Sequence, residues 1–443
     1  MQKISSRLRI AIDCSSTRTC EFNSGIQRVV RSLCEQSQSS ASRTIHGIPV
    51  HGANGHWYEA KSLWPEPAKV ATPAATQLSV LLKPHRSFTS KVARELERTF
   101  RKLRNRWQVP GTLVSQGERK LELGSQDVLL MADASWMEPN WDAVANAKAC
   151  EAKIGLLIYD LIPLTNPDLF PPELVSRFRS WFERAILNAD FIVCISQSVA
   201  SSVVSELREH DQGSRLAAKT YWFPLGANLR IAEQFESPIS EVQAWFAAER
   251  FENPCLVVGT LEPRKNHNLI LDAFEQLWED GSSLSLCLLG RIGWNCKSLL
   301  TRIRTHPEFG RKLFMHTDAS DEDVHHAYSR ARSVIMASIN EGYGLPIVEG
   351  LGYRQTVLAS DIAVHREVGQ DQVHYFSIAH GPTALRRMLA KVEQRNLPCL
   401  LGADGAAAKN VISWKQSYET LCETILEATR ESGASMVQVN RAA

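Results

Sequence analysis

The sequence predicts an α/β protein made of two Rossmann-like, doubly wound domains, and three observations lead to this prediction. The chain has 443 residues, more than the roughly 100–200 residues that a single domain usually takes. Short apolar runs alternate with amphipathic stretches, which is the pattern of βαβ units and parallel sheets. This alternation occurs twice, on either side of a stretch near 226–252 that has no strand pattern.

The first series of predicted strands consists of four apolar runs, at 8–13, 127–133, 153–160 and 190–196. The helices expected in this series are 25–36, 172–188 and 197–210. The second series of strands is expected at 254–260, 284–290, 333–338 and 356–360. Apolar residues recur on one face of the helix that follows the first of these strands, and a last amphipathic helix is expected over 413–428. The predicted domains are residues 1–240 and 241–412, followed by a helix and tail over 413–443.

The composition is that of a soluble globular protein, with 44% hydrophobic and 22% charged residues. It excludes a wholly disordered or collagen-like chain, and a formal charge of +2 gives no indication of nucleic-acid binding. No apolar run approaches the roughly 18 residues that span a bilayer, and the first residues lack the apolar core of a secretory signal. Ten cysteines without C-x-x-C spacing are expected to be free thiols, mostly buried. The expected location is therefore the cytoplasm.

Residues 83–108 form a separate basic segment with nine Lys/Arg and two acidic residues. Its apolar residues recur at three- or four-residue steps, which predicts a basic amphipathic helix. The apolar stripe consists of Val92, Leu96, Phe100, Leu103 and Trp107. Two interpretations remain open: a surface helix packed on the core, or a helix drawn to anionic lipid on the inner face of the cytoplasmic membrane. Nucleic-acid binding is less favoured, because no recognised nucleic-acid motif accompanies the segment.

The most informative stretch runs from 338 to 349 and follows a predicted strand. Two glycines, Gly342 and Gly344, precede a proline near the first position of a helix. Unpaired amides of such a loop and helix N-terminus suit a diphosphate. Glu341 and Glu349 stand eight residues apart, and carboxylates accept hydrogen bonds from sugar or ribose hydroxyls. The alternative is a tight βα turn with two solvated glutamates.

A second loop, 259–266, follows the strand predicted at 254–260 and carries the adjacent cations Arg264 and Lys265. Ligands bind at the carboxyl ends of strands in open α/β sheets, so these cations are placed to neutralise phosphate. The alternative is a pair of solvated loop cations.

The stretches GTLEPRKN (259–266) and EGYGLPIVE (341–349) together resemble the retaining glycosyltransferases of family 4. Members of that family have the GT-B fold, in which two Rossmann-like domains face each other across a cleft. Their Glu-x7-Glu motif is matched by Glu341 and Glu349. Gly259 and Lys265 also fit, while Gly290 and Trp294 match a common turn of the same domain. The resemblance is strongest over about 250–380.

The N-terminal half resembles the bacterial capsule and O-antigen subset of the family less sharply. The matching features are the loop that contains Gly25 and the block that contains Tyr159 and Asp160. Many members have His where this chain has Tyr159, so the donor-binding role of that position is open. The common Gly-Arg-Leu is replaced by a sequence without the arginine, so Arg264 is expected to supply the second cation beside Lys265.

The resemblance implies a retaining, metal-independent transferase that moves a sugar from a nucleotide sugar to a glycan or lipid-linked glycan of bacterial surface polysaccharide. GDP-mannose or a deoxyhexose donor is favoured, and no cofactor, metal or nucleic acid is expected. The resemblance assigns acceptor binding to the N-terminal domain and donor binding to the C-terminal domain. It also implies that the last helix crosses back to the N-terminal domain. The implied catalytic residues are Glu341, Arg264 and Lys265. The implied donor-binding residues are Gly25, Gly259, Gly290, Gly342, Tyr343, Gly344, Leu345, Glu349, Tyr159 and Asp160.

Two alternatives belong to other functional classes. A GT-B nucleotide-sugar epimerase would need acid and base groups in the cleft and no acceptor. A non-catalytic scaffold would have a decayed site, against which the intact Glu341, Glu349 and Lys265 argue. Turnover of the donor with and without an acceptor separates these alternatives from a transferase.

Overall fold

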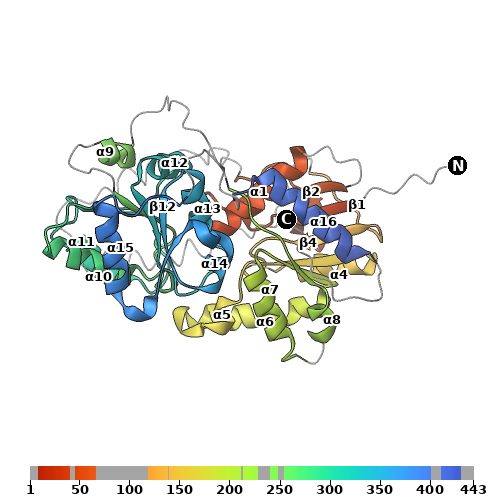
Figure 1. The fold of residues 1–443 in the computed structure, drawn as a ribbon. Helices are drawn as coiled ribbons and strands as arrows, with labels where there is room; N and C mark the ends of the chain where they lie inside the picture. The colour runs from red at the N-terminus through yellow and green to blue at the C-terminus, as the bar shows by residue number, and fades with distance from the viewer. Residues whose placement is uncertain are drawn as a thin grey trace, which may run out of the picture.

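The computed structural model contains two α/β lobes, each built around its own sheet (Figure 1). It describes residues 8–39, 45–65, 118–137, 139–210, 213–227, 240–247, 254–400 and 411–430. The basic segment 83–108 lies outside these ranges. The expectation of two Rossmann-like domains with the GT-B architecture is confirmed.

The first sheet has seven strands in the order β3-β2-β1-β4-β5-β6-β7, all parallel except β3. Its strands are β1 (Leu8–Asp13), β2 (Ile45–Ala53), β3 (His56–Glu59), β4 (Asp127–Met131), β5 (Lys153–Ile158), β6 (Phe191–Cys194) and β7 (Thr220–Trp222). The four strands predicted from apolar runs are present, and β2, β3 and β7 were missed. The sequence of β2, IHGIPVHGA, is interrupted by Gly, Pro and His although most of it is buried, and β3 and β7 are only four and three residues long.

The helices that flank this sheet are α1 (Gly25–Ser39), α4 (Trp141–Ala149), α5 (Ile162–Thr165), α6 (Pro172–Asn188), α7 (Gln197–Leu207) and α8 (Gly213–Ala217). Three of them, α1, α6 and α7, correspond to the helices expected at 25–36, 172–188 and 197–210. In α1, Val29, Val30 and Leu33 form a buried face. Helix α7 begins where the Ser196 side chain accepts a hydrogen bond from the amide of Val199, a standard N-cap.

The second sheet has six parallel strands in the order β10-β9-β8-β11-β12-β13. The strands are β8 (Cys255–Val258), β9 (Leu286–Leu289), β10 (Leu313–His316), β11 (Ser333–Met336), β12 (Thr356–Ser360) and β13 (His374–Phe376). The helices are α9 (Glu241–Ala247), α10 (His267–Glu279), α11 (Lys297–Arg304), α12 (Asp321–Arg330), α13 (Leu345–Gly352), α14 (Ala363–Gly369) and α15 (Pro382–Glu393). The analysis of the sequence did not predict β10 and β13, the two edge strands of this sheet.

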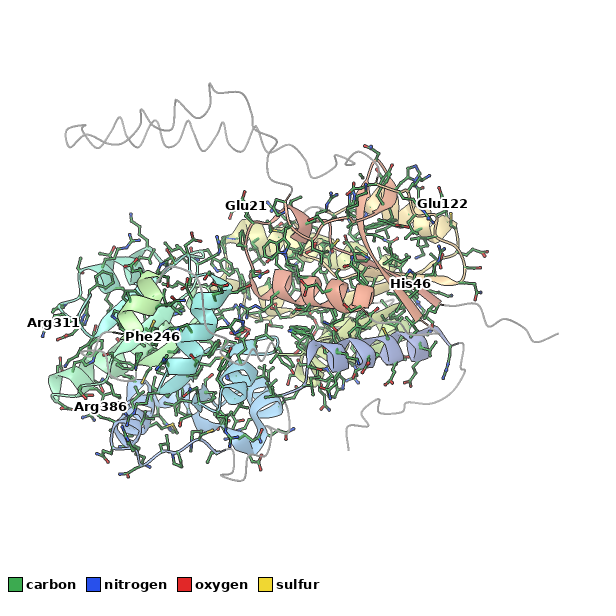
Figure 2. The ribbon with its side chains drawn as sticks, turned by 90° about the horizontal axis from the view of Figure 1, so that it is seen from above. Glu21, His46, Glu122, Phe246, Arg311 and Arg386 are labelled. Atoms are coloured by element: carbon green, nitrogen blue, oxygen red, sulfur yellow. The ribbon has the colours of Figure 1, made fainter. Side chains whose placement is uncertain are left out.

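The last described helix, α16 (Trp414–Thr429), returns to the first lobe, where it lies beside α1 in both views (Figures 1 and 2). Ser413 and Gln416 form a capping box at its start. Tyr418, Leu421 and Ile425 are buried on its inner face. Figure 2 shows Phe246, Arg311 and Arg386 on one lobe and Glu21, His46 and Glu122 on the other.

The ten cysteines all lie in the described ranges and are free thiols, seven of them buried, as their spacing predicted. Among the helices that the structure describes, none is both long and apolar enough to cross a bilayer.

Two buried carboxyl groups lie at the ends of the adjacent parallel strands β1 and β4: Asp13 is the last residue of β1, and Asp133 follows β4. Burial, reinforced by the nearby Asp133, raises the pKa of Asp13 to about 7. Because an unfolded Asp titrates near 4, the native state binds more protons between about pH 4 and pH 7. We therefore expect the contribution of Asp13 to the free energy of unfolding to fall by a few kcal/mol as the pH rises through this window.

Asp13→Asn is expected to remove that contribution from the pH dependence, while its amide oxygen can still accept the hydrogen bond from the Ser15 amide. Chemical denaturation at a series of pH values between 4 and 8 measures the effect. The exposed Asp142, in the first turn of α4, provides the control variant Asp142→Asn. An unchanged slope in Asp13→Asn would contradict the assignment.

Candidate functional site

The two loops singled out by the sequence follow β8 and β11, the adjacent strands at which the order of the second sheet reverses. Loops at such a switch point diverge to opposite faces of the sheet and leave a crevice between them. The first loop ends in a short 3-10 turn, Pro263–Lys265, and the second leads into α13. The fold therefore brings the residues of 259–266 and 341–349 together.

Glu341 lies between two cations. One carboxylate oxygen is 2.6 Å from Arg264 Nη1, and the other forms an ion pair with Lys265 and accepts a 2.7 Å hydrogen bond from the Ser338 hydroxyl. Burial alone would raise the pKa of Glu341, but Arg264 and Lys265 outweigh it and hold the pKa well below its usual range. Glu341 is therefore ionised at any working pH, and a solvated loop glutamate is the wrong description of it.

Arg264 is held by a second carboxylate that the sequence analysis did not assign. Its Nε lies 2.6 Å from Glu262 Oε1 at ion-pair distance, without the alignment of a hydrogen bond. Burial lowers the pKa of Arg264, but Glu341 and Glu262 raise it above its ordinary value overall. Burial raises the pKa of Asp160, an effect that Arg264 partly offsets. Arg264 is thus a charged group, already oriented beside Lys265 in a sheltered cluster.

Two glycines shape the second loop. Gly344 is the N-cap of α13 with φ at +99°, a conformation that residues with a side chain rarely adopt. A Cβ on Gly342 would lie 2.1 Å from the carbonyl oxygen of Tyr159, so only glycine permits this approach between the lobes. Leu345 opens α13, and the Tyr343 hydroxyl donates to the carbonyl of Leu225, 3.1 Å away.

The glycines of the neighbouring loops occupy the same edge of the sheet. Gly259 and Gly290 follow β8 and β9, and a Cβ on Gly290 would meet the Gly259 carbonyl oxygen at 1.8 Å. Trp294, in the same turn as Gly290, donates a 2.8 Å hydrogen bond from its ring nitrogen to the carbonyl of Leu169.

Glu349, in α13, is also buried and bonded. Its Oε2 accepts a 2.7 Å hydrogen bond from the Tyr328 hydroxyl, and its Oε1 lies 2.5 Å from Arg28 Nη1. It lines a cavity of about 210 Å³, whereas Glu341 lines a larger open pocket of about 1330 Å³ that Asp160 also borders. Glu341 and Glu349 thus line two different cavities.

Tyr159 does not have the placement that a donor-contacting side chain needs. Its hydroxyl donates a 2.6 Å hydrogen bond to the carbonyl of Ala132, and its ring is buried in the first lobe. The side-chain role suggested for it is therefore corrected: only its backbone reaches Gly342. Gly25, the first residue of α1, is exposed, and no atom lies within 4 Å of where its Cβ would be.

Polar contacts join the two lobes around the site. The Ser196 hydroxyl donates to the carbonyl of Gly342 over 2.8 Å, and Asn340 donates to the Asn166 side chain over the same distance. The Glu367 carboxylate, in α14, accepts hydrogen bonds from the amides of Gln197 and Ser198 at the start of α7.

Sequence reasoning assigned no role to four residues that build these contacts: Arg28, Glu262, Tyr328 and Glu367. Arg28 and Glu262 lie inside the stretches that carry the family resemblance, so a signal was present. Tyr328 and Glu367 lie in helices within the range of the resemblance, 250–380, but in neither of the two motifs that carry it. No group of three or more His, Cys, Asp or Glu in the described ranges is arranged to hold a metal ion.

Comparison with known proteins identifies a family that part of this chain resembles. The model of the family "Glycosyl transferases group 1" matches residues 246–399, which include both loops and the whole Glu341 cluster. Over these residues the chain is similar to this glycosyltransferase family. Solved structures agree with its GT-B fold: Anabaena Alr3699/HepE, in complex with UDP and glucose, superposes with a TM-score of 0.59 at 12% identity over 95% of this chain and 99% of that one.

Curated relatives of this chain are named as mannosyltransferases. The serotype-specific mannosyltransferase WbdA of Escherichia coli is 33% identical over 289 residues, which is 64% of this chain and 34% of that protein. The O-antigen chain mannosyltransferase B of Escherichia coli is 24% identical over 219 residues, 48% of this chain and 54% of that protein. The matched part of this chain thus corresponds to about a third of WbdA.

Proposed function

We propose that this protein is a glycosyltransferase that transfers a sugar, with retention of configuration, from a nucleotide sugar to a glycan or lipid-linked glycan of bacterial surface polysaccharide. The observation that carries the proposal is the buried cluster in which Glu341 holds Arg264 and Lys265 at the switch point of the second sheet. The names of the curated relatives favour a mannosyl donor, and GDP-mannose is our first choice.

In the proposed reaction, Arg264 and Lys265 bind the diphosphate and stabilise the negative charge that grows on it as the sugar departs. The N-terminus of α13 lies beside them and contributes its amides. The bond between the sugar C1 and the diphosphate oxygen breaks, and a bond from C1 to the acceptor oxygen forms on the same face. The acceptor proton leaves with the diphosphate. Glu341 positions the sugar hydroxyls, and Glu349 accepts hydrogen bonds from the ribose.

A panel of UDP-, GDP- and dTDP-sugars tests this function. A ligand that binds only the native state raises the melting temperature, so the correct nucleotide should stand out before any acceptor is known. The selected donor is then incubated with and without O-antigen glycan acceptors. A product only with acceptor supports the transferase. An epimerised donor without acceptor would establish the epimerase, and no binding or turnover would leave the scaffold.

We expect the addition of EDTA to leave most of the transfer activity. The two fixed cations, Arg264 and Lys265, supply the positive charge that a divalent metal ion provides in other phosphate-transfer sites. Initial rates are compared with and without EDTA and again after added Mg²⁺ or Mn²⁺. A rate that collapses in EDTA and returns with the metal would contradict metal independence.

We also propose a cytoplasmic location with peripheral contact at the inner membrane face, through the basic segment 83–108. Each cation near an anionic surface contributes roughly 1 kcal/mol, so several suffice for reversible binding. The protein is expected to float with anionic vesicles at low salt, and less so at high salt or as Arg98→Glu plus Arg101→Glu. Absence of flotation at low salt would favour a helix packed on the core and a soluble acceptor.

A further inference from the structure

Arg28, in the first turn of α1, reaches from the N-terminal domain to two carboxylates of the C-terminal domain. Its Nη1 is 2.5 Å from Glu349 Oε1, and its Nη2 is 3.7 Å from Asp321 Oδ1 at the start of α12. Asn23, just before α1, donates a 2.8 Å hydrogen bond to the other oxygen of Asp321. The start of α1 is therefore fastened to α12 and α13.

This ion pair is sheltered enough to be effective. The side chains of Arg28 and Glu349 are 21% and 9% exposed, and the Glu349 carboxylate is the largest cause of the raised pKa of Arg28. Ion pairs on open surfaces contribute little, whereas charge-assisted hydrogen bonds away from water are among the stronger ones. The Asp321 side chain is 55% exposed, so we assign the main role to Glu349.

Glu349 is held from both domains at once. Tyr328, on its own domain, donates to Oε2 and is fixed in turn by stacking on Tyr353, with ring centroids 5.6 Å apart. Arg28, on the facing domain, occupies Oε1. A carboxylate has about four acceptor sites, so a pair of ribose hydroxyls can still bind beside these two donors.

We propose that Arg28 is a positioning residue that makes nucleotide binding depend on the contact between the two domains. The proposal rests on the proposed function, in which Glu349 accepts the ribose hydroxyls. When the lobes separate, Glu349 keeps only Tyr328 and its carboxylate is free to turn. When they meet, Arg28 fixes the carboxylate in the direction that the ribose needs. Ribose recognition and domain contact thus stabilise each other.

The test compares the binding of GDP and of 2′,3′-dideoxy-GDP, which lacks both ribose hydroxyls, by calorimetry. UDP and its dideoxy analogue are run in parallel. We expect the intact protein to prefer the ribose form. Arg28→Ala is expected to weaken binding of that form about tenfold or more, with little effect on the dideoxy form. In assays over a range of donor concentrations, KM for the donor is expected to rise more than kcat falls.

The matched control is Arg9→Ala, which removes an arginine–carboxylate pair with Asp127 inside the N-terminal domain. It is expected to lower thermal stability and leave the ribose preference intact. Arg28→Lys keeps the charge and serves if the alanine variant does not fold; it is expected to retain part of the preference. An Arg28 variant that folds and keeps the full ribose preference would overturn the proposal. Failure of the wild-type protein to bind any nucleotide would instead overturn the proposed function.

Discussion

Glu341→Gln is expected to reduce sugar transfer by at least about a hundredfold, the scale seen when one preorganised electrostatic group of an active site is removed. The carboxylate forms ion pairs with both Arg264 and Lys265 and so fixes the two cations together. Glutamine keeps the size and the oxygen acceptor but not the charge, so the two cations lose their common anchor. Steady-state rates with the selected donor and acceptor measure the effect.

The same variant is expected to unfold at a lower temperature. A glutamate in an exposed loop would carry no such penalty, but Glu341 is buried, and removing one partner of a buried ion pair costs about 3–5 kcal/mol. Rates must therefore be measured where the variant is folded, as shown by circular dichroism. Glu279→Gln, at the exposed end of α10, is the matched control. A folded Glu341→Gln protein with near wild-type activity would remove Glu341 from the catalytic assignment.

Lys265→Ala is expected to lower both the affinity for the donor and the turnover rate, with a combined loss in kcat/KM of about a hundredfold or more. Lysine contributes a bond to the diphosphate that strengthens as negative charge develops, so its loss reaches kcat as well as KM. Arg264 remains paired with Glu341 in this variant and keeps the loop in place. Initial rates over a range of donor concentrations separate the two constants.

Lys297→Ala, at the exposed start of α11, controls for the loss of a positive charge on this domain. Lys265→Arg is expected to recover part of the donor affinity. If Lys265→Ala changed the melting temperature alone, Lys265 would be structural and the diphosphate would have to bind elsewhere.

The parts of the fold that local sequence could predict are those with a continuous apolar run. The strands β4, β5, β6, β8, β9, β11 and β12 are of this kind. By contrast, β2 carries Gly, Pro and His in a buried strand, and β13 has only three residues, so neither has a period to detect. Their pairing with β1 and β12 supplies the stability that their own sequences do not signal.

In the candidate site, too, the residues that could be predicted are those with a signal in the local sequence. Glu341, Arg264 and Lys265 stand in compact loops, where charge, glycine and strand ends coincide within a few residues. Tyr328 stands 21 positions from Glu349 and meets it once their shared domain has folded, whereas Arg28 stands 321 positions away and meets it only after both domains have formed. The orientation of the Tyr159 side chain could not be predicted either. Its position at a strand end places the residue near the site but does not show whether its ring points into the core.

Glu367, in α14, forms a contact between the domains that involves backbone amides at the start of α7. Its carboxylate accepts hydrogen bonds of 2.7 and 2.8 Å from the amides of Gln197 and Ser198, so a residue of one domain completes the first turn of a helix in the other. Separation of the domains removes that acceptor and exposes both amides to solvent, while the Val199 amide keeps its bond to Ser196. Deuterium uptake at these two amides thus records each opening of the cleft in the unlabelled protein, with the next amide of the same helix as its internal reference.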